Sequence, residues 1–342
     1  AFNNCSSLKS VKYASSVSSI GKHAFENCSS LKQVIIPETV TSIGDNPFAR
    51  CNNLQSISVS RFNPNYDSRD YCNAIISKAD NKLVSGCTYT IIPESVTTIG
   101  RYAFEGMYNL KSITIPSTVT TLDDYAFKGC SGLTTIVIPA NVTQVGSEAF
   151  SECMGLIEVF CLGKVPPTTA DDTYVTFAQS IYDRTPLRVR RSCIDAYKTT
   201  GSWKGFAHIE GIDGYLYAGN CKFFSGDSFT VPVELINDTE ITGIQVDVKM
   251  PEGISVAMDS EDYPMVFLTD RKSRTHGIMA NYVNASTLRI LSTSSNNRPF
   301  TGSEGELFNI TFKTDPTLSA GMHTVQFKNI EISPCDGAKL LP

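Results

Sequence analysis

A pattern of apolar and polar positions repeats along the first half of the chain. It has the form LxxIxIPxxVxxIGxxAFxxCxxL, which the segment 110–133 illustrates. The LxxIxI part alternates with a period of two and is rich in Ile, Val and Thr, which predicts a short β-strand. The proline that follows has no N–H to donate, so it predicts the end of the strand. We expect the Val, Ile and Ala-Phe positions of the return path to point inward.

The Phe of this unit recurs every 23 residues, apart from one longer copy. It occurs at Phe2, Phe25, Phe48, Phe104, Phe127 and Phe150. The interval between Phe48 and Phe104 is 56 residues, so the third copy carries an insertion of 33 residues (56 − 23). Self-similarity at such a period predicts a solenoid, because one unit cannot bury its apolar side alone. Stacked copies would place their strands side by side as a parallel sheet.

This unit resembles the BspA-like subfamily of leucine-rich-repeat proteins, common on the surface of gut and oral Bacteroidetes. IGxxAFxxCxxLxxIxIP recurs almost unchanged, and the resemblance covers residues 1–213. The insertion near 61–88 resembles a hairpin that these proteins often carry, with its turn at residues 79–82. Residues 166–213 resemble the family's terminal cap, in which a short helix at 194–199 and Trp203 would close the core.

The sequence pattern changes near residue 213, where the 23-residue repeat ends. Alternating strands at short spacing, separated by Gly, Asn, Asp and Pro, predict an all-β sandwich over residues 214–342. The runs GDSFTVPVELIN, ITGIQVDVKMPEGI and GELFNITFK resemble the cohesin-type sandwich, which has a jelly-roll topology. Known cohesins dock a calcium-binding dockerin, but only framework residues match here, so that activity is not carried over. The expected fold class is mainly β, a solenoid followed by a cohesin-like sandwich.

Most cysteines belong to the repeat. Of eleven, five lie three residues after the repeat Phe: Cys5, Cys28, Cys51, Cys130 and Cys153. A small apolar side chain in a tight interior turn explains them better than redox or metal chemistry, since there is no CxxC or His/Cys cluster. Cys72 and Cys87 lie in the insertion, and the sequence leaves open whether they form a disulfide.

Alternation also predicts which side chains of the strands face solvent. They are Gln33, Ile35, Ser56, Ser58, Tyr89, Ile91, Ser112, Thr114, Thr135, Val137, Glu158 and Phe160. Only Glu158 is charged. An ordinary solvated sheet and a binding surface explain this set about equally well, and in the second case Tyr89 and Phe160 would be the anchors.

Composition and charge reduce the number of functions that the chain could have. The net charge is −5, charged residues make up 18% of the chain, and no basic run tracks a phosphate backbone, so nucleic acid is not an expected partner. No apolar segment approaches the ~20 residues of a membrane span, and we find no signal peptide. An export signal is expected to have been removed. The acidic groups at Asp259, Glu261, Asp262 and at Asp171-Asp172 lack EF-hand spacing, and solvated acids are the commoner case. The four histidines have no ligand-spaced neighbours, so we expect neither catalysis nor a cofactor.

The leading hypothesis is a monomeric, non-enzymatic protein of the cell surface that binds host extracellular or bacterial surface proteins through the outward side chains of the sheet. The first alternative is glycan capture, with Tyr66, Tyr89 and Phe160 stacking on sugar rings. The second alternative is a passive structural stalk.

Overall fold

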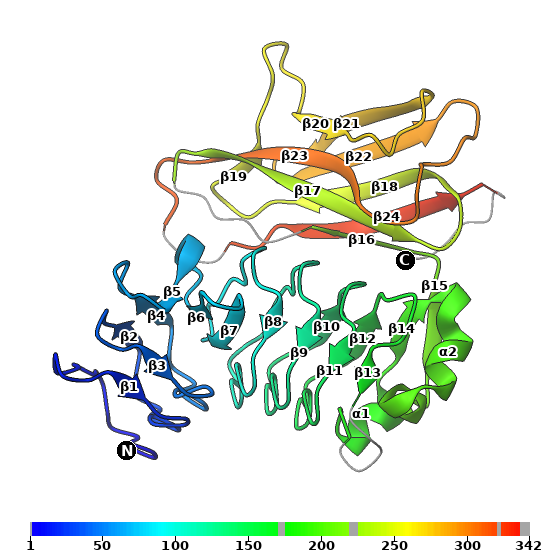
Figure 1. Cartoon of the computed structure of the whole chain (residues 1–342). Helices are drawn as coiled ribbons and strands as arrows, with labels where there is room; N and C mark the ends of the chain where they lie inside the picture. Colours follow the sequence, from blue (N-terminus) through cyan, green and yellow to red (C-terminus); the bar gives the residue numbers. More distant parts are fainter. Residues whose placement is uncertain (1, 170–174, 219–224, 320–322, 336–342) are drawn as a thin grey trace. The chain divides into compact units, whose positions relative to one another are not determined.

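The computed structural model describes residues 2–169, 175–218, 225–319 and 323–335 (Figure 1). The chain divides into two compact units, Ala1–Gly211 and Ile212–Pro342. We call them the solenoid and the sandwich. The sequence pattern placed the boundary at residue 213, two residues further along the chain.

One row of strands in the solenoid comes from the LxxIxI segments. Its members are β2 (Gln33–Ile36), β4 (Ser56–Val59), β10 (Thr135–Ile138), β12 (Glu158–Cys161), β14 (Leu187–Arg190) and β15 (Ile209–Ile212). β2 and β4 form one parallel pair, and the other four form a second sheet in the order β10-β12-β14-β15. The expected strands near 89–92 and 112–115 are not formed. In the first of these segments Thr90 Oγ1 accepts the N–H of Cys87 at 2.7 Å, which folds the chain into a turn.

A second row of strands was not expected. It contains β13 (Thr168–Thr169), β11 (Gln144–Val145), β9 (Thr121–Leu122), β8 (Thr98–Ile99), β7 (Lys82–Ser85), β6 (Ile75–Ser77) and β5 (Tyr66–Asp67), in that order. A separate pair, β1 (Ser19–Ile20) and β3 (Ser42–Ile43), comes from the same repeat position. Most of these strands have only two residues, too few for an alternating pattern to reveal them.

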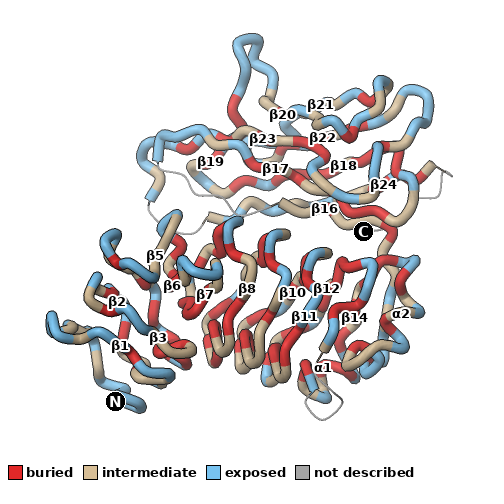
Figure 2. Tube along the Cα trace, viewed as in Figure 1, coloured by how far each residue is buried: buried red, intermediate tan, exposed pale blue. Residues whose placement is uncertain are grey.

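The insertion forms the expected hairpin. β6 and β7 pair antiparallel around a turn at residues 78–80, and Asn81 adopts a left-handed φ of 53°. β7 then pairs parallel with β8, so the hairpin continues the second row, while the short helix η1 (Arg69–Tyr71) lies before it. The insertion divides the apolar interior into two clusters, and buried positions recur along the inside of both (Figure 2).

Stacked Phe rings form the centre of each cluster. Phe25 stacks on Phe48 at 5.4 Å, and Phe127 stacks on Phe104 at 5.1 Å and on Phe150 at 5.4 Å. The stack is interrupted between Phe48 and Phe104, where the ring of Phe104 lies against Gly86 of the insertion. A Cβ at Gly86 would lie 2.1 Å from that ring, so only glycine fits there.

Four of the five repeat cysteines are buried as expected, and their thiols also form hydrogen bonds. Cys28, Cys51, Cys130 and Cys153 each donate a hydrogen bond to the carbonyl of the Phe in the preceding copy, at 3.0–3.1 Å. Cys5 is exposed. Cys72 and Cys87 are free thiols, and each lies against a backbone carbonyl of the insertion.

The cap closes the solenoid with short helices, as the resemblance implied. They are α1 (Gln179–Arg184), η2 (Arg191–Cys193), α2 (Ile194–Thr199) and η3 (Gly201–Gly205). Trp203 is fully buried, its edge packs on Phe177 at 5.9 Å, and its indole N–H donates to the carbonyl of Pro167 at 2.8 Å.

The sandwich consists of two antiparallel sheets around one apolar core. The first has the order β16 (Gly214–Ala218), β17 (Ser228–Asn237), β23 (Glu306–Thr314) and β19 (Ile254–Val256), with β20 (Val266–Leu268) also on β23. The second has the order β21 (His276–Asn284), β22 (Thr287–Ser294), β18 (Ile241–Lys249) and β24 (Gln326–Pro334).

Candidate functional site

The candidate site is the outer side of the LxxIxI segments, which we call the strand face. It consists of the twelve side chains predicted from alternation, and none of them is buried. β2 and β4 place Gln33 opposite Ser56 and Ile35 opposite Ser58. Ile35 is 62% exposed, a large fraction for an apolar side chain on a strand.

The strand face is interrupted in its middle copies. Tyr89 lies in a turn and is 42% exposed, and Ile91 is half-buried. Ser112 is exposed and Thr114 half-buried, although their segment makes no strand ladder. These four residues therefore keep their outward position while the sheet beneath them is missing.

The insertion adds aromatic side chains that sequence reasoning missed. Tyr71 is 76% exposed at a left-handed φ of 49° and follows Asp70, whose φ is 54°. Hydrogen bonds from Asn73 Nδ2 to the Tyr89 carbonyl and from the Ile91 N–H to the Cys72 carbonyl hold this segment beside Tyr89. Left-handed backbone at bulky residues persists only where surrounding contacts fix it, and both tyrosines are exposed in the two segments that these hydrogen bonds join. The tyrosines in this one insertion were the signal in the sequence that could have pointed to Tyr71.

The other end of the strand face carries its charge. Thr135 pairs with Glu158 and Val137 with Phe160, and Arg188 follows Phe160 in register on β14. The Arg188 guanidinium bonds Glu158 at 3.3 Å and Glu210 at 2.9 Å, and it lies 6.0 Å from the Phe160 ring centroid. Alternation in Leu187–Arg190 could have identified Arg188, but the repeat register had already decayed there.

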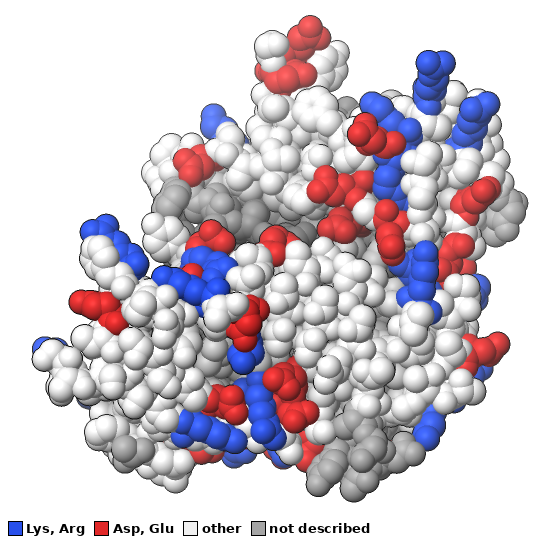
Figure 3. Space-filling model, in the orientation of Figure 1, with Lys and Arg blue, Asp and Glu red and all other residues white. Residues whose placement is uncertain are grey.

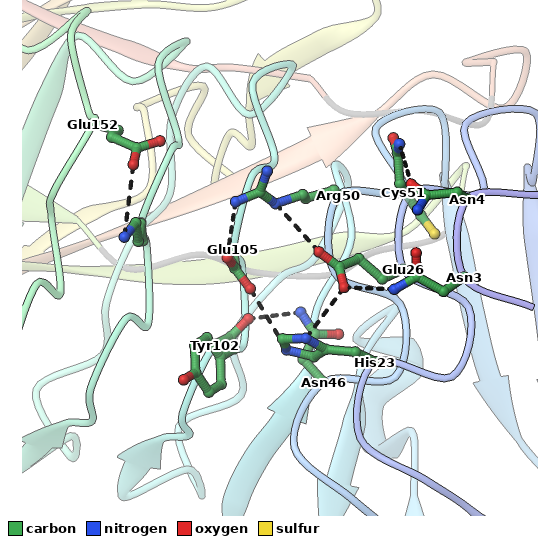
Figure 4. A network of polar contacts seen from close by, with 12 residues as sticks. Asn3, Asn4, His23, Glu26, Asn46, Arg50, Cys51, Tyr102, Glu105 and Glu152 are labelled. Atoms are coloured by element: carbon green, nitrogen blue, oxygen red, sulfur yellow. Dashed lines mark hydrogen bonds and ion pairs between the residues drawn. The ribbon is translucent and has the colours of Figure 1, made fainter. Parts of the chain in front are cut away.

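Other charged side chains of the solenoid lie in turns, among them Glu26, Arg50 and Glu105. On the face that Figure 3 shows, acidic and basic residues of the solenoid form a band with uncharged surface around it. Arg50 contacts Glu26 at 3.6 Å and Glu105 at 3.2 Å, while His23 lies 3.3 Å from Glu26 and 3.6 Å from Glu105 (Figure 4). Glu105 is only 6% exposed. Because these contacts join copies on both sides of the insertion, we assign this network to holding neighbouring copies together.

No group of three or more His, Cys, Asp or Glu in the described part of the chain is arranged to hold a metal ion. The Asp259 carboxylate accepts the N–H groups of Glu261 and Tyr263 at 2.9 and 3.0 Å, which is a loop-capping role. Asp171 and Asp172 lie outside the described residues. Among the helices described, none has the length and apolarity to span a bilayer.

Comparison with known proteins finds a family model that matches the solenoid. The BspA type leucine rich repeat region family matches residues 1–79 and 82–168, in six copies. A leucine-rich repeat protein from Eubacterium ventriosum is 31% identical over 56% of this chain and 53% of its own, with a TM-score of 0.44. A leucine rich cell surface protein from Faecalibacterium prausnitzii is 25% identical over 60% of this chain and 54% of its own, with a TM-score of 0.46.

The sandwich is similar in fold to cohesins. A non-cellulosomal cohesin from Archaeoglobus fulgidus is 22% identical over 38% of this chain and 84% of its own, with a TM-score of 0.31. This likeness concerns the fold alone. The chain spans about half the length of the two leucine-rich repeat proteins. No curated protein matches it.

Proposed function

Because residues 1–168 form a BspA-type leucine-rich-repeat region, we propose that the protein is a non-enzymatic adhesion protein of the cell surface. It binds host extracellular proteins or surface proteins of other bacteria through the strand face. The observation that supports this most is that twelve side chains from six copies are exposed or half-buried and that only Glu158 among them is charged. Solenoids commonly use such extended surfaces for recognition.

The chemistry of the strand face sets the mode of binding. Hydroxyl, amide and apolar groups exchange contacts with water for contacts with a partner at little electrostatic cost, so affinity comes from many neutral hydrogen bonds and buried apolar area. Tyr89 and Phe160 are the aromatic anchors of the strand face, and Tyr71 of the insertion adds a third aromatic side chain. Such an interface depends weakly on salt.

Alanine variants with a matched control test this proposal. The whole chain is applied to a panel of purified extracellular-matrix proteins, and we expect Tyr71→Ala, Tyr89→Ala and Phe160→Ala to lose about tenfold or more in affinity with an unchanged melting temperature. Tyr108→Ala is the control, because Tyr108 is 49% exposed in the turn after Met107 and outside the strand face. Equal losses in the control, or an affinity that collapses in high salt, would reject binding by the strand face.

Glycan capture remains the second candidate, supported by the exposed pair Tyr71 and Tyr89. Tyr66 supports it less, because this residue lies on β5 in the second row of strands, and its half-buried hydroxyl accepts the N–H of Ile43 at 2.9 Å. A glycan array that gives no signal with the whole chain rejects this candidate. If neither array nor protein panel gives a partner, the stalk hypothesis is favoured.

A further inference from the structure

Within the described part of the sandwich, β21 is a long edge strand that lacks the usual protection against pairing. β21 (His276–Asn284) pairs only with β22 among the described residues, from His276 opposite Ser294 to Asn284 opposite Thr287. Its sequence, HGIMANYVN, contains no proline and no acidic or basic residue other than His276. An edge of this kind offers backbone N–H and C=O groups to another strand.

The other edges of the sandwich are blunted. β24 is equally long but carries Lys328, Glu331 and Pro334. β19 and β20 have three residues each and β16 has five, so each offers only a short ladder. Charges, prolines and shortness are the usual devices that keep edge strands from pairing. β21 has none of them before the bulge between Tyr282 and Asn284.

The side chains of β21 match a second copy of the same strand. Register with β22 places Ile278, Ala280 and Tyr282 on the side of the core, and Met279 and Asn281 on the outer side. An antiparallel pair with a two-fold axis at Ala280 would set Ile278 opposite Tyr282 of the second copy and Met279 opposite Asn281 of the second copy. The smallest of these side chains lies on the axis, where two identical residues meet. No charge opposes the approach.

We propose that β21 is a self-association surface, which joins two copies of the chain through an antiparallel strand pair centred on Ala280. The bulge limits the pair to about five residues, and an interface of that length falls short of the ~1,000 Å² typical of stable complexes. The dimer is therefore weak and concentration-dependent. This differs from the monomer expected from the sequence. It is also independent of the strand face, because β21 belongs to the sandwich.

Charge substitutions on the outer side of β21 test both the surface and the register. Met279 is 58% exposed and Asn281 is exposed, so lysines fit there without disturbing the core. In Met279→Lys/Asn281→Lys every opposed pair is Lys against Lys, and we expect sedimentation velocity to show loss of the dimer. In Met279→Glu/Asn281→Lys every opposed pair is Glu against Lys, and we expect the dimer to return.

Phe267→Lys is the matched control. Phe267 is 53% exposed on β20, a short strand of the other sheet, and this variant should dimerise like the unmodified chain. Circular dichroism confirms that all variants fold. A chain that stays monomeric at every concentration, a dimer that survives the double lysine variant, or a dimer that the Glu/Lys variant fails to restore would each overturn the proposal.

Discussion

The solenoid and the sandwich hold their cores by different kinds of contact. In the solenoid a side chain meets its own equivalent in the next copy, as in the Phe stack, or a fixed partner, as in the thiol bonds to the preceding Phe carbonyl. In the sandwich the partners come from unrelated segments. Arg271 is 9% exposed and donates five hydrogen bonds, to Leu235, Asn237, Thr301, Gly302 and Gly305.

This difference determines how strongly a substitution should lower the stability of each unit. A defect in the solenoid removes one of several equivalent contacts, and its cost depends on how many neighbouring copies surround the site. A defect in the sandwich removes a contact that no other residue duplicates. Trp203 makes the comparison measurable, because it is the single tryptophan and lies in the solenoid, so its fluorescence reports that unit alone.

The largest effect is expected at an interior position of the Phe stack. Phe127 is fully buried with a ring on both sides, so Phe127→Ala should lower the free energy of unfolding of the solenoid by about 3–5 kcal/mol. Phe2 is 49% exposed and stacks on Phe25 alone, so Phe2→Ala should cost less than about 1 kcal/mol. Urea unfolding followed by Trp203 fluorescence measures both. Equal losses would mean that the copies do not stabilise one another.

Arg271→Ala should affect the sandwich almost as strongly. It leaves five acceptors without their donor, and we expect a loss of about 3 kcal/mol or more. Urea unfolding followed by circular dichroism should show the sandwich unfolding earlier, while the Trp203 transition stays in place. Arg271→Lys keeps the charge but not the planar fork, so it should recover only part of the loss. A shift of the Trp203 transition would contradict the assignment of Arg271 to the sandwich alone.

The same contrast explains what the sequence could predict. The solenoid, its hairpin and the buried repeat cysteines follow from period and register, because repeated positions imply repeated contacts. The hydrogen bonds of the repeat thiols and the missing strand at Thr90 depend on the local geometry of single copies, which the shared repeat pattern does not describe. Arg271 bonds to carbonyls 30–36 residues away, and no spacing rule identifies such partners.

Some residues of the candidate site could likewise be predicted from the repeat, and others could not. Alternation named twelve side chains, and none of them is buried, although the segments of Tyr89, Ile91, Ser112 and Thr114 form no strand whose side a period of two could fix. Tyr71 escaped because the insertion has no counterpart in the other copies. Arg188 escaped because the cap breaks the period. Binding by these residues stays a prediction.

A smaller effect is expected from the thiol bonds. Cys153 donates to the Phe127 carbonyl at 3.0 Å, and Cys153→Ala removes that bond at a cost of about 1 kcal/mol. Cys153→Ser keeps a donor of similar size, so its Trp203 unfolding curve should lie closer to that of the unmodified chain. If Cys153→Ala and Cys153→Ser lower the free energy of unfolding equally, packing alone explains the small side chain at this position of the repeat.

The stability of the two units should depend on pH in opposite directions. Near neutral pH this effect should be the smallest of those predicted here. In the solenoid, burial raises the pKa of the Cys153 thiol from 9.0 to about 12. The unfolded chain therefore releases this proton first, so stability is complete below pH 9 and falls as the pH rises from about 9 toward 12. In the sandwich, hydrogen bonds from Arg289 and Asn329 hold the pKa of Asp247 below its usual range. That contribution is complete above the usual Asp pKa and is lost as the pH falls from there through the lowered pKa of the folded state.

Unfolding curves in acidic, neutral and alkaline buffer under reducing conditions measure this difference. Trp203 fluorescence should show the solenoid weakening in alkali, and Cys153→Ser should reduce that slope, because its hydroxyl does not titrate there. Circular dichroism should show the sandwich weakening in acid, and Asp247→Asn should flatten that slope while lowering stability at neutral pH. Because the two titrating groups lie in different units, each substitution should change one slope only. If Asp247→Asn altered the alkaline slope of Trp203 fluorescence, the two units would not unfold independently.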